Sequence, residues 1–221
     1  EPLFGYADHP YLFFRDKDVP WLREKFTKPM FRDYRQRVLH NANGWLKRAP
    51  SKSHNASVTA TFNLSFAYVF TGDDRYKAKL MQWVRAGWAQ TRFDDFNLMS
   101  LTGMALAYDV LFRDLSPADR AAFQDYLDRG IDGYHTFSDA WFLGNGPNFS
   151  NTVPVGNSGG MLAGLAMMHS TPRARSAVDI AAQKTAIYPE RCMSPDGGCR
   201  EGVQYWDFGG TFHLILAHAL Q

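Results

Sequence analysis

The sequence lacks the features that mark several large classes of protein. It has only two cysteines in 221 residues, and no apolar run approaches the roughly 20 residues that a membrane-spanning helix needs. Its 24 Lys and Arg nearly balance its 22 Asp and Glu, for a net charge of +2, and it has no basic arm, zinc-finger spacing or RNA-binding signature. We therefore expect no membrane span and no nucleic-acid partner.

Motifs of several enzyme classes are also missing. The sequence contains no Gly-x-Ser-x-Gly, no phosphate-binding loop and no dinucleotide fingerprint. Two cysteines are too few for a structural zinc site, and His213 and His218 miss the i, i+4 spacing of helical zinc ligands. We expect no metal and no cofactor in this chain. Cys192 and Cys199 lie seven positions apart, a spacing compatible with a short disulfide and equally with two reduced thiols.

Helical periodicity dominates what is present. Apolar residues make up 45% of the chain and recur three and four positions apart, and no stretch alternates convincingly like a strand. The pattern predicts about eight helices: 18–46 with a break at Pro29, 58–70, 74–90, 97–112, 117–134, 159–169, 172–188, and a last one from about Glu201. Hairpins of this kind, repeating at roughly 45 to 60 residues, indicate an all-α array, either a toroid or a solenoid.

The remaining segments read as connections. Residues 1–17 form an irregular lead-in without the basic and apolar regions of a signal peptide, and 18–221 form the helical domain. Polar loops are predicted at 47–57 and 138–158. The last eight residues stop inside an apolar pattern without a helix stop signal, so we expect the natural protein to continue.

One segment, 195–209, combines a tight turn with a dense group of polar and aromatic residues. Pro195-Asp-Gly-Gly198 supplies turn chemistry, because Pro fixes φ, Asp can bond the nearby backbone and Gly tolerates positive φ. Five polar or aromatic residues then fall within seven positions: Glu201, Gln204, Tyr205, Trp206 and Asp207. Such a group suits the floor of a polar binding cleft, or a solvated helix start whose aromatics pack inward.

Several motifs together resemble the N-terminal (α/α) toroid of the heparinase II/III-like polysaccharide lyases. They run in order from residue 9 to 209: His9-Pro-Tyr-Leu-Phe-Phe, Ala67-Tyr-Val-Phe-Thr-Gly-Asp-Asp-Arg-Tyr76, Ala107-Tyr-Asp-Val-Leu-Phe112, an Asn-rich loop before a Gly-Gly-Met helix, and Pro195-Asp-Gly-Gly-x2-Glu-Gly-x2-Tyr-Trp206. The resemblance implies an incomplete (α/α) toroid, followed by a β-sandwich domain that this chain does not include.

The resemblance also assigns candidate site residues. It makes Tyr205 the catalytic acid and base and Asn151 the group that neutralises the substrate carboxylate, with Asn148 as the fallback. Family members often carry His in or beside this loop, whereas no His occurs between 136 and 168. A further catalytic His, and any metal bound there, belongs to the β-sandwich domain.

Further residues are expected to bind substrate. They are Glu201, Gln204, Trp206, Arg200, His54 and Asn55. Each also has an ordinary interpretation: Trp206 suits a core position and Arg200 a solvated one, His54 and Asn55 suit a solvated loop, and Glu201 suits a bond to backbone N–H groups at a helix start.

The chemistry implied is β-elimination on an acidic polysaccharide of the alginate or glycosaminoglycan type. The C5 proton of a uronate becomes acidic enough to remove only when hydrogen bonds stabilise extra negative charge on the neighbouring carboxylate, which an Asn amide can do. A basic role for Tyr205 needs a cation that favours the phenolate, and Arg200 and His213 are near in sequence. A histidine satisfied in the core is the ordinary interpretation of His213.

Other functions remain open at this point. A uronate C5-epimerase uses the same proton abstraction, and a non-catalytic carbohydrate-binding module keeps the fold without the chemistry. A glycoside hydrolase needs two carboxylates about 5 to 9.5 Å apart, and no pair stands out. The resemblance implies a periplasmic or secreted protein, and residues 1–221 alone are expected to be weakly active or inactive.

Overall fold

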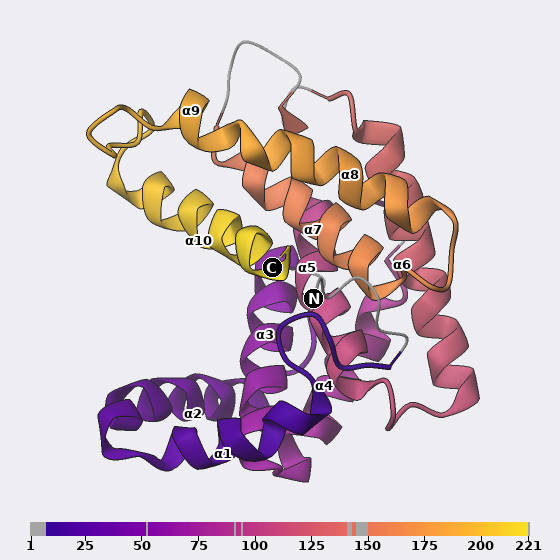
Figure 1. The fold of residues 1–221 in the computed structure, drawn as a ribbon. Coiled ribbons are helices and arrows are strands. Elements are labelled where there is room, and N and C mark those ends of the chain that lie inside the picture. The colour runs from indigo at the N-terminus through magenta and orange to yellow at the C-terminus, as the bar shows by residue number, and fades with distance from the viewer. Residues whose placement is uncertain are drawn as a thin grey trace.

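The computed structural model describes residues 8–51, 53–90, 92–93, 95–140, 143–144 and 150–220, and these residues are all-α, with no strand among them. A single isolated β-bridge joins Met193 to Cys199. The helices, drawn in Figure 1, are α1 (Val19–Thr27), α2 (Arg32–Leu46), α3 (His54–Thr71), α4 (Asp74–Gly87), α5 (Asp95–Leu111), α6 (Pro117–Phe137), α7 (Thr152–Ala166), α8 (Arg173–Ala186), α9 (Tyr188–Cys192) and α10 (Val203–Ala219), with 3₁₀ turns η2 (Asp16–Asp18) and η3 (Pro29–Phe31). No helix among these residues has both the length and the apolar content needed to cross a bilayer.

Several helix ends form as their local sequences predict. Ser116 accepts a hydrogen bond from the backbone N–H of Asp119 at 3.1 Å and so caps α6. Gly72 ends α3 with φ 70°, and Asp73 caps α4 by accepting from the N–H of Arg75 at 2.9 Å. The expected break at Pro29 is present, because η3 separates α1 from α2 there.

Two helix starts differ from expectation. The polar loop predicted at 47–57 ends at Ser53, whose hydroxyl accepts from the N–H of Ala56, so His54 and Asn55 form the first turn of α3. The long loop predicted at 138–158 is wrong from residue 152 onward, where α7 begins. Pro154 is tolerated there because it lies among the first helical residues, whose N–H groups have no partner within the helix.

The core of the fold is a layer of parallel helices. Between α5 and α7, Met99 shares an apolar cluster with Val155, and the hydroxyls of Thr102 and Ser158 are 2.7 Å apart. From the first of these contacts to the second, the residue numbers increase on both helices, so α5 and α7 are parallel.

The helix α3 continues this layer beside α5. Gly103 of α5 packs so closely on α3 that an added Cβ would lie 2.1 Å from the hydroxyl oxygen of Thr61. Further along both helices, Tyr68 donates a hydrogen bond to Asp114, just beyond α5, at 3.0 Å. These contacts also advance together, which makes α3 and α5 parallel.

The helix α10 extends the layer on the other side of α7. A Cβ at Gly209 would lie 3.0 Å from the Cβ of Asn151, and Phe212 joins the cluster that contains Val155. The residue numbers again increase on both helices from one contact to the next, so α10 is parallel to α7. Because α3, α5 and α7 are also parallel, their starts lie at one end of the layer. The first residues of α10, before Gly209, extend beyond the start of α7.

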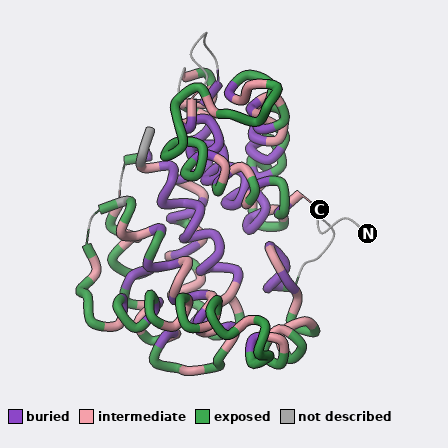
Figure 2. Tube along the Cα trace, turned by 90° about the vertical axis from the view of Figure 1, so that its left-hand side faces the viewer, coloured by how far each residue is buried: buried purple, intermediate pink, exposed green. Residues whose placement is uncertain are grey.

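The helices α4, α6 and α8 back this layer and each bury one face. Their buried residues recur three or four positions apart, as for Tyr76, Leu80, Trp83 and Val84 of α4. By contrast, every residue of α7 from Val153 to Ala166 is buried. Figure 2 shows buried residues along the central helices and exposed residues around them. The result is a two-layer helical array.

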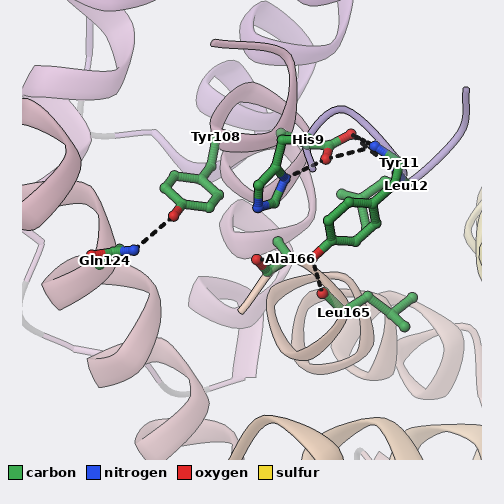
Figure 3. A network of polar contacts seen from close by, with 8 residues as sticks. His9, Tyr11, Leu12, Tyr108, Gln124, Leu165 and Ala166 are labelled. Atoms are coloured by element: carbon green, nitrogen blue, oxygen red, sulfur yellow. Dashed lines mark hydrogen bonds and ion pairs between the residues drawn. The ribbon is translucent and has the colours of Figure 1, made fainter. Parts of the chain in front are cut away.

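The lead-in before η2 is fastened to the opposite end of the parallel layer. The buried carboxylate of Asp109 lies 2.6 Å from Nδ1 of His9 and accepts from the backbone N–H groups of Tyr11 at 3.0 Å and Leu12 at 3.1 Å. The hydroxyl of Tyr11 donates to the carbonyl of Leu165 at 2.8 Å. Figure 3 shows this network, which joins the lead-in to the last turns of α5 and α7.

Candidate active site

The turn before α10 forms as its sequence predicts. The N–H of Gly197, whose φ is 85°, donates to the carbonyl of Ser194 at 2.8 Å, with Pro195 at the second position of the turn. Asp196 accepts from the N–H of Gly198 at 3.1 Å. The bridge between residues 193 and 199 closes the turn, which brings the chain back toward α9 before α10 begins.

Glu201 bonds a helix start, but the helix is α7 rather than α10. Its carboxylate accepts from the backbone N–H of Asn151 at 2.6 Å and from the side-chain Nδ2 of Asn151 at 3.0 Å. Gly202, at φ 95° and ψ 175°, turns the chain between Glu201 and α10 in a conformation that favours glycine. The carboxylate therefore holds both the backbone and the amide of Asn151.

Asn151 is the cap residue of α7 and is only 7% exposed. Its amide nitrogen carries two hydrogens, so one N–H remains for a ligand after the bond to Glu201. Asn148, the fallback for this role, lies outside the described residues, as do the other residues of 145–149.

Tyr205 lies on the face of α10 that contacts Asn151. Gly209 is the point where α10 touches Asn151, and Tyr205 precedes it by four residues, which places it about one turn, or 5.4 Å, earlier on the same face. The side chain of Tyr205 is 47% exposed. The structure thus pairs Asn151 with Glu201 and places Tyr205 about one helical turn before the contact between α10 and Asn151, although these residues are separated by up to 54 positions in the sequence.

Beneath this face lie two polar groups that the sequence did not single out as a pair. The hydroxyl of Tyr188 is buried, and so is Nδ1 of His213; neither has a hydrogen-bond partner among the described residues. Their ring centroids are 5.5 Å apart, and an added Cβ at Gly209 would lie 2.5 Å from the hydroxyl of Tyr188. The interpretation of His213 as a satisfied core histidine is therefore wrong for Nδ1.

Burial decides the charge state of this pair. It raises the pKa of Tyr188 well above its ordinary value, and the thiols of Cys192 and Cys199 and the carboxylate of Glu201 raise it further. Burial lowers the pKa of His213 below 6.5, so the imidazole is neutral near pH 7. His213 is therefore not the cation that a Tyr205 phenolate would need.

The two cysteines are free thiols in the structure. Cys192 is buried, and burial together with the carboxylate of Glu201 raises the pKa of its thiol to about 12. A thiol with such a pKa is a weak nucleophile at neutral pH, which favours a packing role for Cys192.

The other expected substrate-binding residues are less closely gathered. Arg200, Gln204 and Trp206 are exposed beside Tyr205, and Trp206 is 47% exposed, so it is not the core residue that its type suggested. His54 and Asn55 begin α3, and no contact joins either of them to Tyr205, Asn151 or Glu201 among the described residues; the side chain of His54 lies outside the described part. In the described part of the chain, no group of three or more His, Cys, Asp or Glu is placed to hold a metal.

No protein-family model matches this chain, and no curated protein matches it. The function is therefore inferred from the residues of the site and from the motifs that carry the resemblance.

Proposed function

We propose that the chain is the helical domain of a lyase that cleaves uronate-containing polysaccharide by β-elimination. The observation that carries the proposal is the pairing of Asn151 with Glu201, with the exposed phenol of Tyr205 about one helical turn away. The elimination needs a group that binds the carboxylate, a base for the C5 proton and an acid for the departing oxygen; we give the first role to Asn151 and the other two to Tyr205.

The helix directions support an anionic substrate. The starts of α3, α5 and α7 lie at the end of the layer that holds Asn151. Helix N-termini carry partial positive charge and stabilise anions nearby. A uronate carboxylate at the start of α7 would gain from this field as well as from the free N–H of Asn151.

The proposed reaction divides the work between these residues. Asn151 donates a hydrogen bond to the substrate carboxylate, which stabilises the charge that develops as the C5–H bond breaks. Tyr205 in its phenolate form accepts the C5 proton, the C4–O bond breaks as the C4–C5 double bond forms, and Tyr205 returns that proton to the departing oxygen. Arg200 remains the candidate cation for a phenolate form of Tyr205 that accepts the C5 proton.

The proposal extends to the architecture and the location. The parallel layer backed by α4, α6 and α8 supports an incomplete (α/α) toroid. Val203 and Leu214 of α10 are 84% and 69% exposed, and such apolar surface supports contact with the β-sandwich domain that the resemblance places downstream. We assign the protein to the periplasm or the exterior, where polysaccharides of this size occur.

The test is the ultraviolet absorbance of unsaturated uronate, followed over time on alginate, chondroitin-type and heparan-type chains. The natural-length protein is compared with Tyr205→Phe, which we expect to lower turnover by about 10² to 10⁴-fold, the usual contribution of a general acid or base. The exposed side chain makes the variant fold normally, so its melting temperature is the control.

A lack of absorbance change on all three substrates contradicts the lyase. Exchange of the C5 hydrogen with solvent deuterium would then identify the epimerase. Binding without exchange or cleavage would identify a carbohydrate-binding module.

A further inference from the structure

A polar cleft lies between α2 and α3, away from the site at α10. Its volume is about 280 Å³. The helix α2 contributes Gly44 and Trp45 to its lining, and α3 contributes Thr59 and Asn63. The other lining residues that the structure describes are His40, Asn41 and Arg48, and none of these seven described residues is acidic.

Gly44 is the least expected of these residues, because nothing in the fold requires glycine there. It lies inside α2, its backbone is not left-handed, and a Cβ built on it would meet no atom within 4 Å. Glycine weakens a helix where neither a turn nor a close contact needs it. What its missing side chain does provide is the open space of the cleft.

Arg48 supplies a positioned positive charge at the cleft. Its guanidinium lies 4.7 Å from the centroid of the Trp45 ring, which is only 9% exposed and packs edge-on against Trp83. Arg48 has no carboxylate partner within ion-pair distance among the described residues. Its guanidinium therefore keeps donors free for a ligand, and the indole restricts its orientation.

The cleft belongs to the most basic part of the chain. Residues 17–48, which contain α1 and α2, carry nine Lys or Arg against three Asp or Glu, whereas the rest of the chain carries 15 against 19. This asymmetry is hidden in the small net charge of the whole chain, and it favours an anionic ligand.

We propose that the cleft binds an acidic sugar unit, with Arg48 on its carboxylate or sulfate and the amides of Asn41 and Asn63 on its hydroxyls. The side chain of Asn63 already donates to the carbonyl of Thr59 at 2.7 Å, which leaves its carbonyl oxygen as an acceptor for a sugar hydroxyl. Amides and a hydroxyl around one guanidinium suit a carbohydrate better than the continuous phosphate chain of a nucleic acid. The choice of a uronate as the sugar rests on the proposed function.

The experiment follows two acidic probes, an oligomannuronate and a chondroitin tetrasaccharide, by two-dimensional NMR of the 221-residue chain. Maltotetraose is the neutral control and a single-stranded oligonucleotide is the competing anion. We expect at least one acidic probe to shift the backbone amide of Gly44 and the side-chain amides of Asn41 and Asn63, and maltotetraose to leave them in place.

Two variants locate the binding. Gly44→Leu fills the cleft while strengthening the helix, and Arg48→Gln removes the guanidinium. We expect each substitution to lower the affinity for the acidic probe by about tenfold or more, as measured from the shifts of the remaining reporter amides. Arg175→Gln removes an equal charge from the exposed α8 and is expected to change affinity less than about twofold. The melting temperature of Gly44→Leu should be no lower than that of the wild type.

Three results overturn the proposal: no shift with either acidic probe, unchanged affinity in Gly44→Leu, or tighter binding of the oligonucleotide at the same amides. Turnover of the natural-length protein separates this proposal from the lyase. If the natural-length protein turns over substrate but Gly44→Leu binds the acidic probe as tightly as the wild type, only the proposal for the cleft is refuted. If the acidic probe binds at the cleft but the natural-length protein turns over no substrate, only the proposal of a lyase is refuted.

Discussion

The two ends of the parallel layer differ in whether their buried polar groups have hydrogen-bond partners. At the ends of α5 and α7, the carboxylate of Asp109 and the hydroxyl of Tyr11 both have partners within hydrogen-bond distance. At the start of α7, the hydroxyl of Tyr188 and Nδ1 of His213 are buried and have none among the described residues. Both ends are built from the same helices, so the difference lies in the segments that cover them.

This difference separates a structural network from a candidate site. A satisfied buried group stabilises the fold, and removing its partner costs free energy. An unsatisfied buried group lowers stability, which a protein tolerates where the group meets a ligand or a water molecule. We therefore expect substitutions at the lead-in end to change stability and substitutions at the α10 end to change activity.

The largest stability effect is expected for Asp109→Asn. The amide NH₂ of the new Asn would face the backbone N–H groups of Tyr11 and Leu12, donor against donor, and the negative charge opposite His9 would be gone. We expect the free energy of unfolding to fall by about 3 kcal/mol. Denaturant unfolding followed by circular dichroism measures it. Asp179→Asn, in an exposed pair with Arg175, is the matched control and should cost under about 1 kcal/mol. Equal losses in the two variants would mean that the lead-in network contributes nothing special.

A pair of tyrosine substitutions tests the comparison directly. Tyr11→Phe leaves the carbonyl of Leu165 without its donor, and we expect a loss of about 1 to 2 kcal/mol. Tyr188→Phe removes a buried hydroxyl that has no partner among the described residues, so we expect no loss of stability or a gain of about 1 kcal/mol. The shift of the denaturation midpoint gives both signs. A loss in Tyr188→Phe as large as in Tyr11→Phe would show that the hydroxyl of Tyr188 is satisfied after all.

The smallest effect is the pH dependence that His213 introduces. Because burial lowers its pKa in the folded state below 6.5, the unfolded chain binds the proton more readily. The contribution to stability is complete above about pH 6.5 and is lost as the pH falls toward the folded-state pKa. Unfolding free energies at several pH values between 7.5 and 5.5 should decline less steeply for His213→Gln than for the wild type. Parallel slopes would contradict the assigned burial.

Local chemistry made much of the fold predictable. The caps at Ser116 and Asp73 and the turn at Pro195 depend on residues within a few positions, and all three form. The start of α7 was not predictable in this way, because Pro154 and its glycine neighbours are typical of loops. It is helical because its small residues let α7 pack closely on α5, where a Cβ at Gly159 would lie 2.0 Å from the carbonyl oxygen of Leu98.

The site was predictable only in part. The resemblance named Tyr205 and Asn151, but the bond that holds Asn151 comes from Glu201, 50 positions away. Tyr188 was read as the boundary of a helix, and no spacing rule connects it with His213. Contacts of this length depend on how whole helices pack, which no local pattern in a single sequence reports.

The lead-in network also has a consequence for the order in which the chain acquires its structure during synthesis. His9 cannot make its contact until Asp109, 100 residues later, has been synthesised, and Tyr11 cannot make its hydrogen bond until Leu165, 154 residues later, has been synthesised. At about 5 to 20 residues per second, the second interval lasts about 8 to 30 s. The lead-in thus leaves the ribosome before the helices that it contacts, and it can join α5 to α7 only when both helices exist.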